Sequence, residues 1–236
     1  MMKRMIIAST STVYGSGYLE YLMPALEVFF KKTDCILFIP YARPGGMSYD
    51  AYTEIAGEAF RKIGKEVKGI HEFENCRSAV HEAKAVFVGG GNTFLLVKTL
   101  YENNLMNEIR KEVIKGTLYL GTSAGSNITG PSMQTTNDMP IVYPPSFDTL
   151  GLIGFNLNPH YLDPDPDSKH KGETRETRIK EFHQFNDIPV LGLREGSWLE
   201  VDGDKIFLKG NLKARLFQKG KTPEEIPSGS RVDHIL

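Results

Sequence analysis

Residues 118–127, LYLGTSAGSN, decide how we interpret the rest of the chain. The segment begins with apolar residues, as in a strand buried on both faces, and continues at 121–125 with GTSAG, the pattern of a nucleophile elbow. Glycines flank the serine because so tight a turn leaves no room for side chains. The turn would raise the Ser123 hydroxyl above the carboxyl edge of a sheet, where α/β folds bind their ligands. The stretch therefore predicts a sheet edge that carries a serine nucleophile.

Other segments repeat this strand pattern and alternate with helical patterns. The apolar runs lie at residues 5–8, 35–39 and 85–88, and the helical patterns at 18–32, 49–63, 93–100, 106–115 and 174–185. Strands that alternate with helices form right-handed crossovers, so we predict an α/β fold with a doubly wound, mostly parallel sheet. Short strands after about residue 190 predict antiparallel strands that extend one edge of this sheet. We expect a single domain that spans residues 1–236.

Composition excludes several classes of partner. The net charge of −1 over 236 residues offers no basic field for nucleic acid, and no apolar run is long enough to span a bilayer. Cys35, expected in a buried strand, and Cys76 follow no disulfide or metal-binding pattern, which favours reduced thiols. We therefore expect a cytoplasmic protein that binds neither nucleic acid nor membrane and is a monomer or weak homodimer.

A second glycine-rich loop, VGGGNT at residues 88–93, also follows a buried strand and precedes a helix. It lacks the spacings of the nucleotide-binding loops. It suits an oxyanion hole better, with one N–H donor from Gly91 and the other from Ala124, next to the nucleophile. We predict that Asn92, beside this loop, binds substrate.

A serine nucleophile needs a base, and His160 is the strongest candidate among six histidines. It lies in LNPHY at residues 157–161, after a short apolar run and a proline that fixes the backbone. Four other histidines are interpreted as solvated side chains: His71, His81, His183 and His234. His170 lies between two lysines, whose charges would make it a poor base.

Two carboxylates are candidates for the acid that orients the base. Asp138 lies in a polar turn after the serine, and Glu195 directly follows a buried strand. In α/β-hydrolases the catalytic residues follow one another along the chain as serine, acid and histidine, and this order favours Asp138 as the acid. The position of Glu195 after a buried strand, which would place it at the same sheet edge as the serine, favours Glu195. We favour Asp138 as the essential carboxylate and keep Glu195 as a candidate for direct contact with His160.

The aspartates of the segment DPDPD at residues 163–167 lack the glycine and the distal glutamate of a calcium loop. We interpret this segment as a solvated loop, and we predict no metal site.

Six segments, in order, resemble those of the peptidase E family, the α-aspartyl dipeptidases. They are GGGNTF at 89–94, SAG at 123–125, TTNDMPI at 135–141, NPH at 158–160, KGETRE at 171–176 and EGSW at 195–198. The resemblance implies a fold like that of class I glutamine amidotransferases, with serine in place of cysteine. It also implies a cofactor-free serine dipeptidase that hydrolyses small dipeptides with N-terminal aspartate through a Ser-His-acid triad and an acyl-enzyme. The family acid has been assigned at the positions of both Asp138 and Glu195.

An aspartate side chain that enters a small pocket needs a cationic partner, and arginine binds both carboxylate oxygens. Arg175, at the start of a predicted helix, is our candidate. Two alternative functions remain from the sequence: a cyanophycinase-like serine hydrolase, and a non-catalytic amidotransferase-like binding domain.

Overall fold

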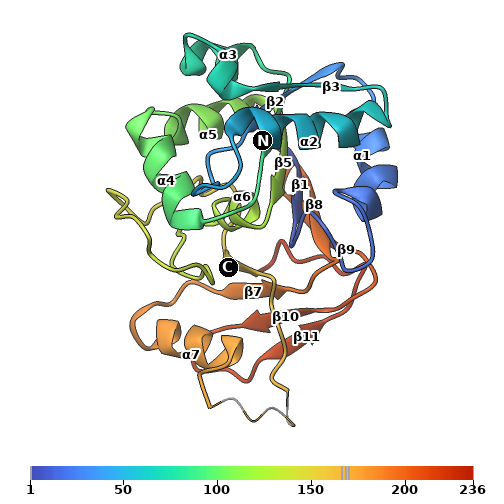
Figure 1. Ribbon diagram of the computed structural model, residues 1–236. Helices are drawn as coiled ribbons and strands as arrows, with labels where there is room; N and C mark the ends of the chain where they lie inside the picture. The colour runs from blue at the N-terminus through green and yellow to red at the C-terminus, as the bar shows by residue number, and fades with distance from the viewer. Residues whose placement is uncertain (1, 166, 168, 170, 236) are drawn as a thin grey trace.

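The computed structural model describes residues 2–165, 167, 169 and 171–235, and it contains two β-sheets (Figure 1). The larger sheet has seven strands in the order β3-β2-β4-β5-β1-β8-β9. Strands β1 to β5 of this sheet run parallel to one another, which confirms the predicted α/β class with a mostly parallel central sheet. The strands are β1 (Arg4–Ala8), β2 (Cys35–Ile39), β3 (Glu66–Gly69), β4 (Ala85–Val88), β5 (Leu118–Thr122), β8 (Trp198–Asp202) and β9 (Lys205–Lys209).

Helices cover both faces of this sheet. Along β1, Met5 and Ile7 belong to one hydrophobic cluster, and Ile6 and Ala8 to another. Because successive strand residues point to opposite faces, a continuous apolar run is what burial on both faces requires. One face packs against η1 (Glu20–Leu22), α1 (Met23–Phe29) and α2 (Tyr49–Arg61), and the other against η2 (Ile70–Glu72), α3 (Cys76–Glu82), α4 (Thr93–Glu102) and α5 (Met106–Lys115).

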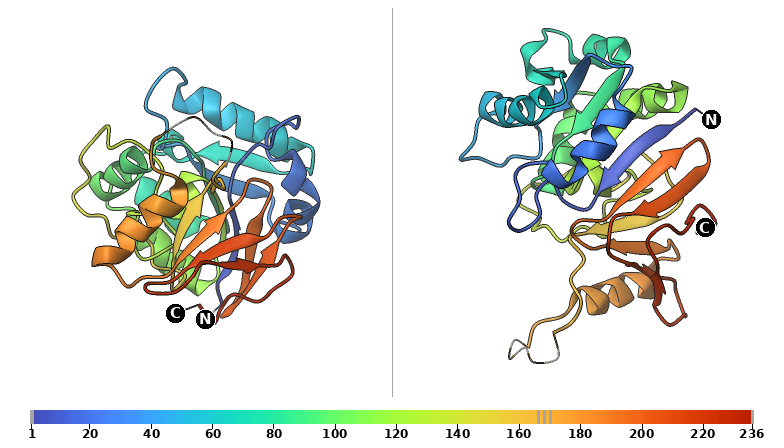
Figure 2. Two further views of the ribbon diagram at one scale, coloured as in Figure 1. Left: turned by 90° about the horizontal axis from the view of Figure 1, so that it is seen from below. Right: turned by 90° about the vertical axis from the view of Figure 1, so that its right-hand side faces the viewer.

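The smaller sheet has four strands in the order β11-β10-β7-β6 and lies below the larger one in the right-hand view of Figure 2, with α7 (Arg175–Phe185) beside it. Its strands are β6 (Asn156–Pro159), β7 (Val190–Leu193), β10 (Ala214–Phe217) and β11 (Glu224–Ile226). Of the late strands, β8 and β9 extend the edge of the larger sheet, with β8 antiparallel to β1. The prediction that all of them do so was wrong for β7 and β10. One hydrophobic cluster nevertheless includes residues of both sheets.

Some local predictions also differ from the structure. The helix predicted at 18–32 is shorter because Pro24 lies in the first turn of α1, a position that proline favours. Helix α3 was not predicted. Cys35 is exposed at the start of β2, so its predicted burial was wrong. Within the described residues, no helix has the length and apolar character needed to cross a membrane.

Candidate active site

Ser123 lies on a strained turn between β5 and the short helix α6 (Ala124–Asn127). Its φ is 53° and its ψ is −110°, a conformation that is costly for a residue with a Cβ atom. Close packing explains the flanking glycines, since a Cβ atom on Gly125 would lie 2.1 Å from the Val88 carbonyl oxygen. The sequence prediction of a helix after the serine is confirmed, but a single turn of four residues adds little dipole to an oxyanion site.

A continuous hydrogen-bond chain joins Ser123, His160 and Glu195. His160 Nε2 lies 2.8 Å from Ser123 Oγ, and His160 Nδ1 lies 2.6 Å from Glu195 Oε1. An ionised carboxylate only accepts hydrogen bonds, so Nδ1 carries the ring proton and Nε2 is left to accept the hydroxyl proton. The structure thus brings the candidate nucleophile, the candidate base and one of the two candidate acids into a single hydrogen-bond chain.

The three residues come from different sheets. Ser123 follows β5 of the larger sheet, whereas His160 and Glu195 follow β6 and β7 of the smaller sheet. Strands β6 and β7 are parallel, with Pro159 opposite Leu193. The two segments that follow these strands therefore leave the sheet at the same edge.

Ser9, which follows β1, holds the backbone of His160 in place. The His160 amide donates to Ser9 Oγ at 2.9 Å, and Ser9 Oγ donates to the Leu193 carbonyl at 2.7 Å. His160 also has a positive φ, 53°. The fully buried Ser9 therefore links the larger sheet to the smaller one next to His160. The sequence analysis missed this role because a serine after a strand has no distinguishing pattern.

Asp138 lies elsewhere in the site. Its Oδ2 accepts hydrogen bonds from the Thr93 amide at 2.7 Å, the Thr93 hydroxyl at 2.6 Å and the Thr136 hydroxyl at 3.0 Å. Thr93 begins α4, directly after the glycine loop. Asp138 therefore connects its own loop to the start of α4. The residue that contacts His160 is Glu195, although the order of residues along the chain had favoured Asp138 for this contact.

The glycine loop borders Ser123. A Cβ atom on Gly90 would lie 3.0 Å from the Ser123 Cβ atom, and one on Gly91, whose φ is 143°, would lie 2.2 Å from the Ala42 carbonyl oxygen. Tyr52 donates a hydrogen bond to the Gly90 carbonyl at 3.2 Å. Among the hydrogen bonds of the described residues, the amides of Gly91 and Ala124 have no protein acceptor, as oxyanion donors require.

Asn92 has a structural task instead of an open binding position. Its side-chain oxygen accepts from the Leu95 amide at 3.1 Å as the N-cap of α4, and its side-chain nitrogen donates to the Met139 carbonyl at 2.9 Å. Substrate binding by Asn92 stays a prediction.

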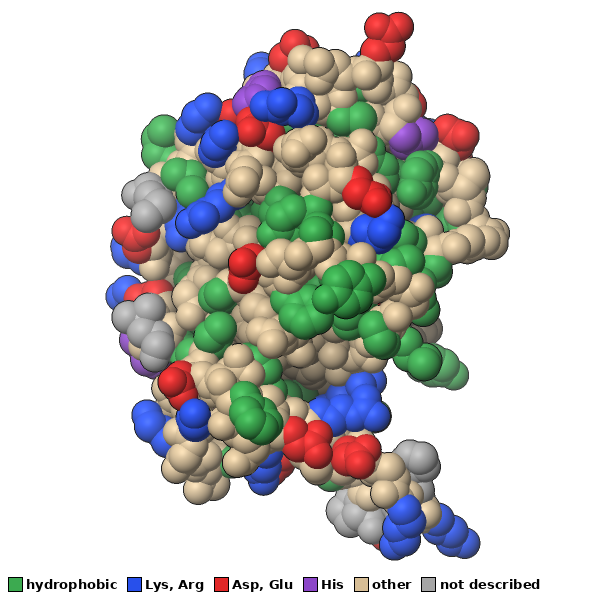
Figure 3. All heavy atoms as spheres, turned by 90° about the vertical axis from the view of Figure 1, so that its left-hand side faces the viewer, with side chains coloured by type: hydrophobic (Ala, Val, Ile, Leu, Met, Phe, Trp, Pro, Cys, Tyr) green, Lys and Arg blue, Asp and Glu red, His purple; other side chains and the backbone are tan. Residues whose placement is uncertain are grey.

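Arg175 begins α7 at the border of a pocket of about 510 Å³, a size suited to a small ligand. Within the described part of the chain it has no hydrogen bond or ion pair from its side chain. Burial and the nearby Arg178 lower the pKa of the Arg175 guanidinium, and Asp138 opposes this shift. Arg178 and Asn137 line the same pocket, and Asn137 donates to the carbonyl of Pro159, the neighbour of His160. Figure 3 shows a notch at the lower right of the molecule with basic side chains at its inner end.

The remaining histidines lie away from this hydrogen-bond chain. The prediction that His183 is solvated was wrong, because His183 is buried and its Nε2 bonds the Ile188 carbonyl. His71 and His81 contact carboxylates of helices, and His234 is exposed. His170 lies outside the described residues. In the described ranges, no group of three or more metal-ligating side chains is assembled.

Comparisons with known proteins show the family of this chain. A family model described as peptidase family S51 matches residues 5–209. The chain belongs to peptidase family S51. Among S51-like relatives, peptidase E of Streptomyces coelicolor is 49% identical over 98% of this chain and 94% of its own length. The Drosophila melanogaster protein named "probable alpha-aspartyl dipeptidase" is 45% identical over 95% and 93%.

A crystal structure supports the S51 fold at lower sequence identity. A peptidase from an acI-B1 Actinobacterium superposes with a TM-score of 0.72 at 16% identity, covering 98% of this chain and 97% of that one. That likeness concerns the fold alone; the family match and the named relatives show that the chain is a serine peptidase, as its sequence predicted.

Proposed function

We propose that this S51 peptidase hydrolyses dipeptides whose first residue is aspartate, with Ser123 as the nucleophile. The observation that carries the proposal is the hydrogen-bond chain from Ser123 through His160 to Glu195. A pocket that Arg175 lines is linked to it through Asn137, which bonds the Pro159 carbonyl next to His160. The names of the S. coelicolor and D. melanogaster relatives support the substrate class.

The reaction follows from the protonation states of the three side chains. Ser123 Oγ attacks the carbonyl carbon of the scissile bond while His160 Nε2 takes the hydroxyl proton, and Glu195 stabilises the imidazolium that forms. Gly91 and Ala124 would donate their amide hydrogens to the oxyanion. His160 then returns the proton to the leaving amine, which leaves an acyl-enzyme. A water molecule, activated by His160, hydrolyses this ester and regenerates Ser123.

Arg175 is the proposed partner of the aspartate side chain. Its guanidinium is partly buried and has no ion pair among the described residues, so an entering carboxylate would gain a partner without displacing another acid. A clamp for one side-chain length discriminates against glutamate, because the extra methylene displaces either the carboxylate or the scissile carbonyl.

A substrate panel tests the proposed function directly. The purified protein is given Asp-Leu, Glu-Leu, β-Asp-Leu, N-acetyl-Asp-Leu and cyanophycin, and kcat/KM is measured for each. We expect Asp-Leu to be hydrolysed most efficiently. Release of β-Asp-Arg from cyanophycin without hydrolysis of Asp-Leu would instead favour a cyanophycinase-like activity, and no hydrolysis at all would favour a binding domain.

Replacing Arg175 with alanine is expected to reduce kcat/KM for Asp-Leu by about 2–5 kcal/mol, the usual cost when a buried charge loses its partner. This is a loss of about thirtyfold to five-thousandfold. Arg175→Lys should recover part of the loss, because lysine keeps the charge without the planar fork.

Arg178→Ala is the matched control, since it removes the neighbouring cation that lines the same pocket. It should cost far less than Arg175→Ala. If Arg175→Ala hydrolyses Asp-Leu as well as the parent, the substrate carboxylate is recognised elsewhere.

We also propose a cytoplasmic location. Cys35 and Cys76 are free thiols, and the cytoplasm keeps such thiols reduced. Fractionation of the native host, followed by detection of the protein in the soluble cytoplasmic fraction, checks this proposal.

A further inference from the structure

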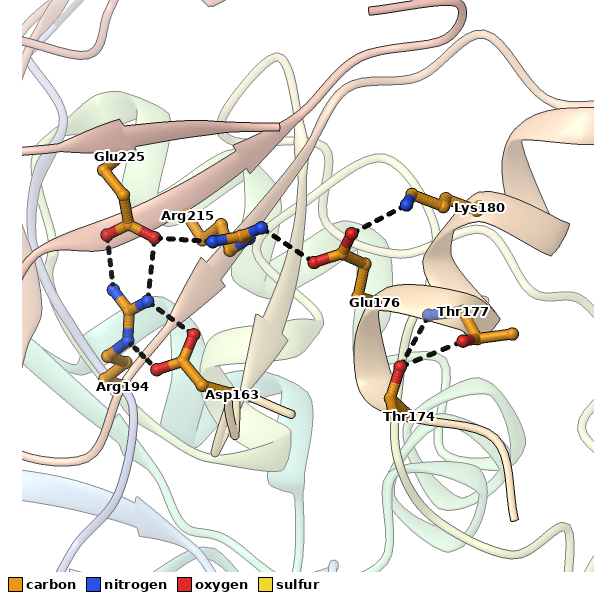
Figure 4. A network of polar contacts seen from close by, with 8 residues as sticks. All are labelled: Asp163, Thr174, Glu176, Thr177, Lys180, Arg194, Arg215 and Glu225. Carbon is orange, nitrogen blue, oxygen red and sulfur yellow. Dashed lines mark hydrogen bonds and ion pairs between the residues drawn. The ribbon is translucent and has the colours of Figure 1, made fainter. Parts of the chain in front are cut away.

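A network of charged side chains runs from the turn that bears Glu195 to the start of α7 (Figure 4). It contains three acids and three bases, drawn from the loop after His160, from α7, from the turn after β7, and from β10 and β11. Its members are Asp163, Glu176, Lys180, Arg194, Arg215 and Glu225. Asp163 is exposed in its loop, as predicted, and in addition it pairs with Arg194.

Arg194 is the most constrained member of the network. Its Nε and Nη2 donate to the two carboxylate oxygens of Asp163 at 2.8 and 2.7 Å, and its Nη1 and Nη2 donate to Glu225, both at 2.9 Å. Its Nη1 also donates to the Lys213 carbonyl at 2.7 Å. A guanidinium has five N–H groups in one plane, and all five are used here. Arg194 is thus held in a single orientation.

Arg215 carries the network onward to α7. Its Nη1 lies 3.1 Å from Glu225 Oε1, and its Nη2 lies 2.8 Å from Glu176 Oε2. Glu176 also accepts from Lys180 one turn further along the helix. The hydrogen bond from Arg194 lowers the pKa of both Asp163 and Glu225, and the hydrogen bond from Lys180 lowers that of Glu176, so the acids stay ionised at neutral pH.

Both ends of the network adjoin residues with proposed roles. Arg194 precedes Glu195 in a turn closed by the hydrogen bond from the Ser197 amide to the Arg194 carbonyl at 3.0 Å. The Glu195 side chain is 50% exposed, and His160 is its one hydrogen-bond partner among the described residues. Its position therefore depends on the turn. At the other end, Glu176 follows Arg175 in the first turn of α7.

We propose that Arg194 and Arg215 are positioning residues, Arg194 for the carboxylate of Glu195 and Arg215 for the guanidinium of Arg175. The ion network would then set the distance between the acid that serves His160 and the cation that receives the substrate side chain. This inference rests on the roles proposed above for Glu195 and Arg175.

Steady-state kinetics on Asp-Leu separate the two positioning roles. Arg194→Lys cannot reproduce five planar donors, and we expect it to lower kcat by about a hundredfold, the effect of a displacement near 1 Å, with KM nearly unchanged. Arg215→Gln should instead raise KM by about tenfold, within the range of coupling between neighbouring groups, with a smaller effect on kcat. Arg61→Gln, which removes an exposed ion pair with Glu54 on α2, is the control and should match the parent.

Double-mutant cycles distinguish positioning from general stabilisation. In a Glu195→Gln background, Arg194→Lys should have no further effect on kcat, and in an Arg175→Ala background, Arg215→Gln should have no further effect on KM. Folded variants with parental kcat and KM, or effects that simply add in both cycles, would overturn the proposal. If Arg194→Lys fails to fold, Glu225→Gln takes its place; it keeps the side-chain shape but weakens a contact of both arginines, so it should lower kcat and raise KM together.

Failure of the proposed function gives a different pattern. In that case Ser123→Ala or Arg175→Ala would keep parental activity. If those two variants are impaired while Arg194→Lys and Arg215→Gln behave as the parent, only the positioning inference fails.

Discussion

Ser123→Ala is expected to lower kcat for Asp-Leu by about a millionfold, as in other serine peptidases that lose their nucleophile. The hydroxyl supplies both the attacking oxygen and the proton that His160 Nε2, 2.8 Å away, would accept. Alanine keeps the Cβ atom, so the strain at φ 53° is unchanged and the fold should persist. Single-turnover assays with purified protein, together with circular dichroism, measure the two effects separately.

Ser126→Ala is a matched control from the same turn. The Ser126 hydroxyl is buried and donates to the carbonyls of Ala8 and Gly121 at 2.6 and 2.8 Å. Its removal should lower the Tm, because two buried acceptors lose a donor, yet leave most of the activity. A folded Ser123→Ala protein with near-parental kcat would exclude Ser123 as the nucleophile.

Glu195→Gln should reduce kcat by about ten-thousandfold, the loss seen when a triad acid becomes an amide. The neutral amide no longer stabilises the imidazolium, and its N–H₂ group favours the wrong tautomer of His160. Asp138→Asn should cost much less, since Asp138 bonds Thr93 and Thr136 and not the imidazole. The pair is compared through kcat over a range of pH.

The order of these two effects is the decisive measurement. A larger loss for Asp138→Asn than for Glu195→Gln would mean that the carboxylate on Thr93 matters more to catalysis than the one on His160. Full activity of both variants would remove the orienting acid from the mechanism altogether.

Much of the fold could be predicted because parallel strands buried on both faces have a local signature. The apolar runs of β1, β2, β4 and β5 carry it, and GTSAG, which begins in the last two residues of β5, locates the proposed nucleophile. The glycines of this motif were also informative, since their requirement is steric and local. His160 could be selected from six histidines by its place after a proline and a short apolar run.

The sequence named both Asp138 and Glu195 as candidate partners of His160 but could not decide between them, because the contact depends on a strand pairing between distant segments. Strand β6 is four residues long, reads Asn-Leu-Asn-Pro, and was not recognised as a strand. Its parallel pairing with β7 sets Pro159 opposite Leu193 and so brings Glu195 to the imidazole. No local sequence pattern indicates which sheet a short strand joins. The smaller sheet and the Arg194 network also depend on pairing between distant segments, so they were not predicted.

The positive φ angles of Ser123 and His160 set a limit on how this enzyme adapts to heat. Each costs of the order of 1 kcal/mol or more in a residue other than glycine. Glycine would relieve the strain at either position, but it would delete the proposed nucleophile or the proposed base. Selection for thermal tolerance cannot recover this energy without loss of activity. Heat-resistant homologues must therefore gain their stability in the core, the surface or the loops.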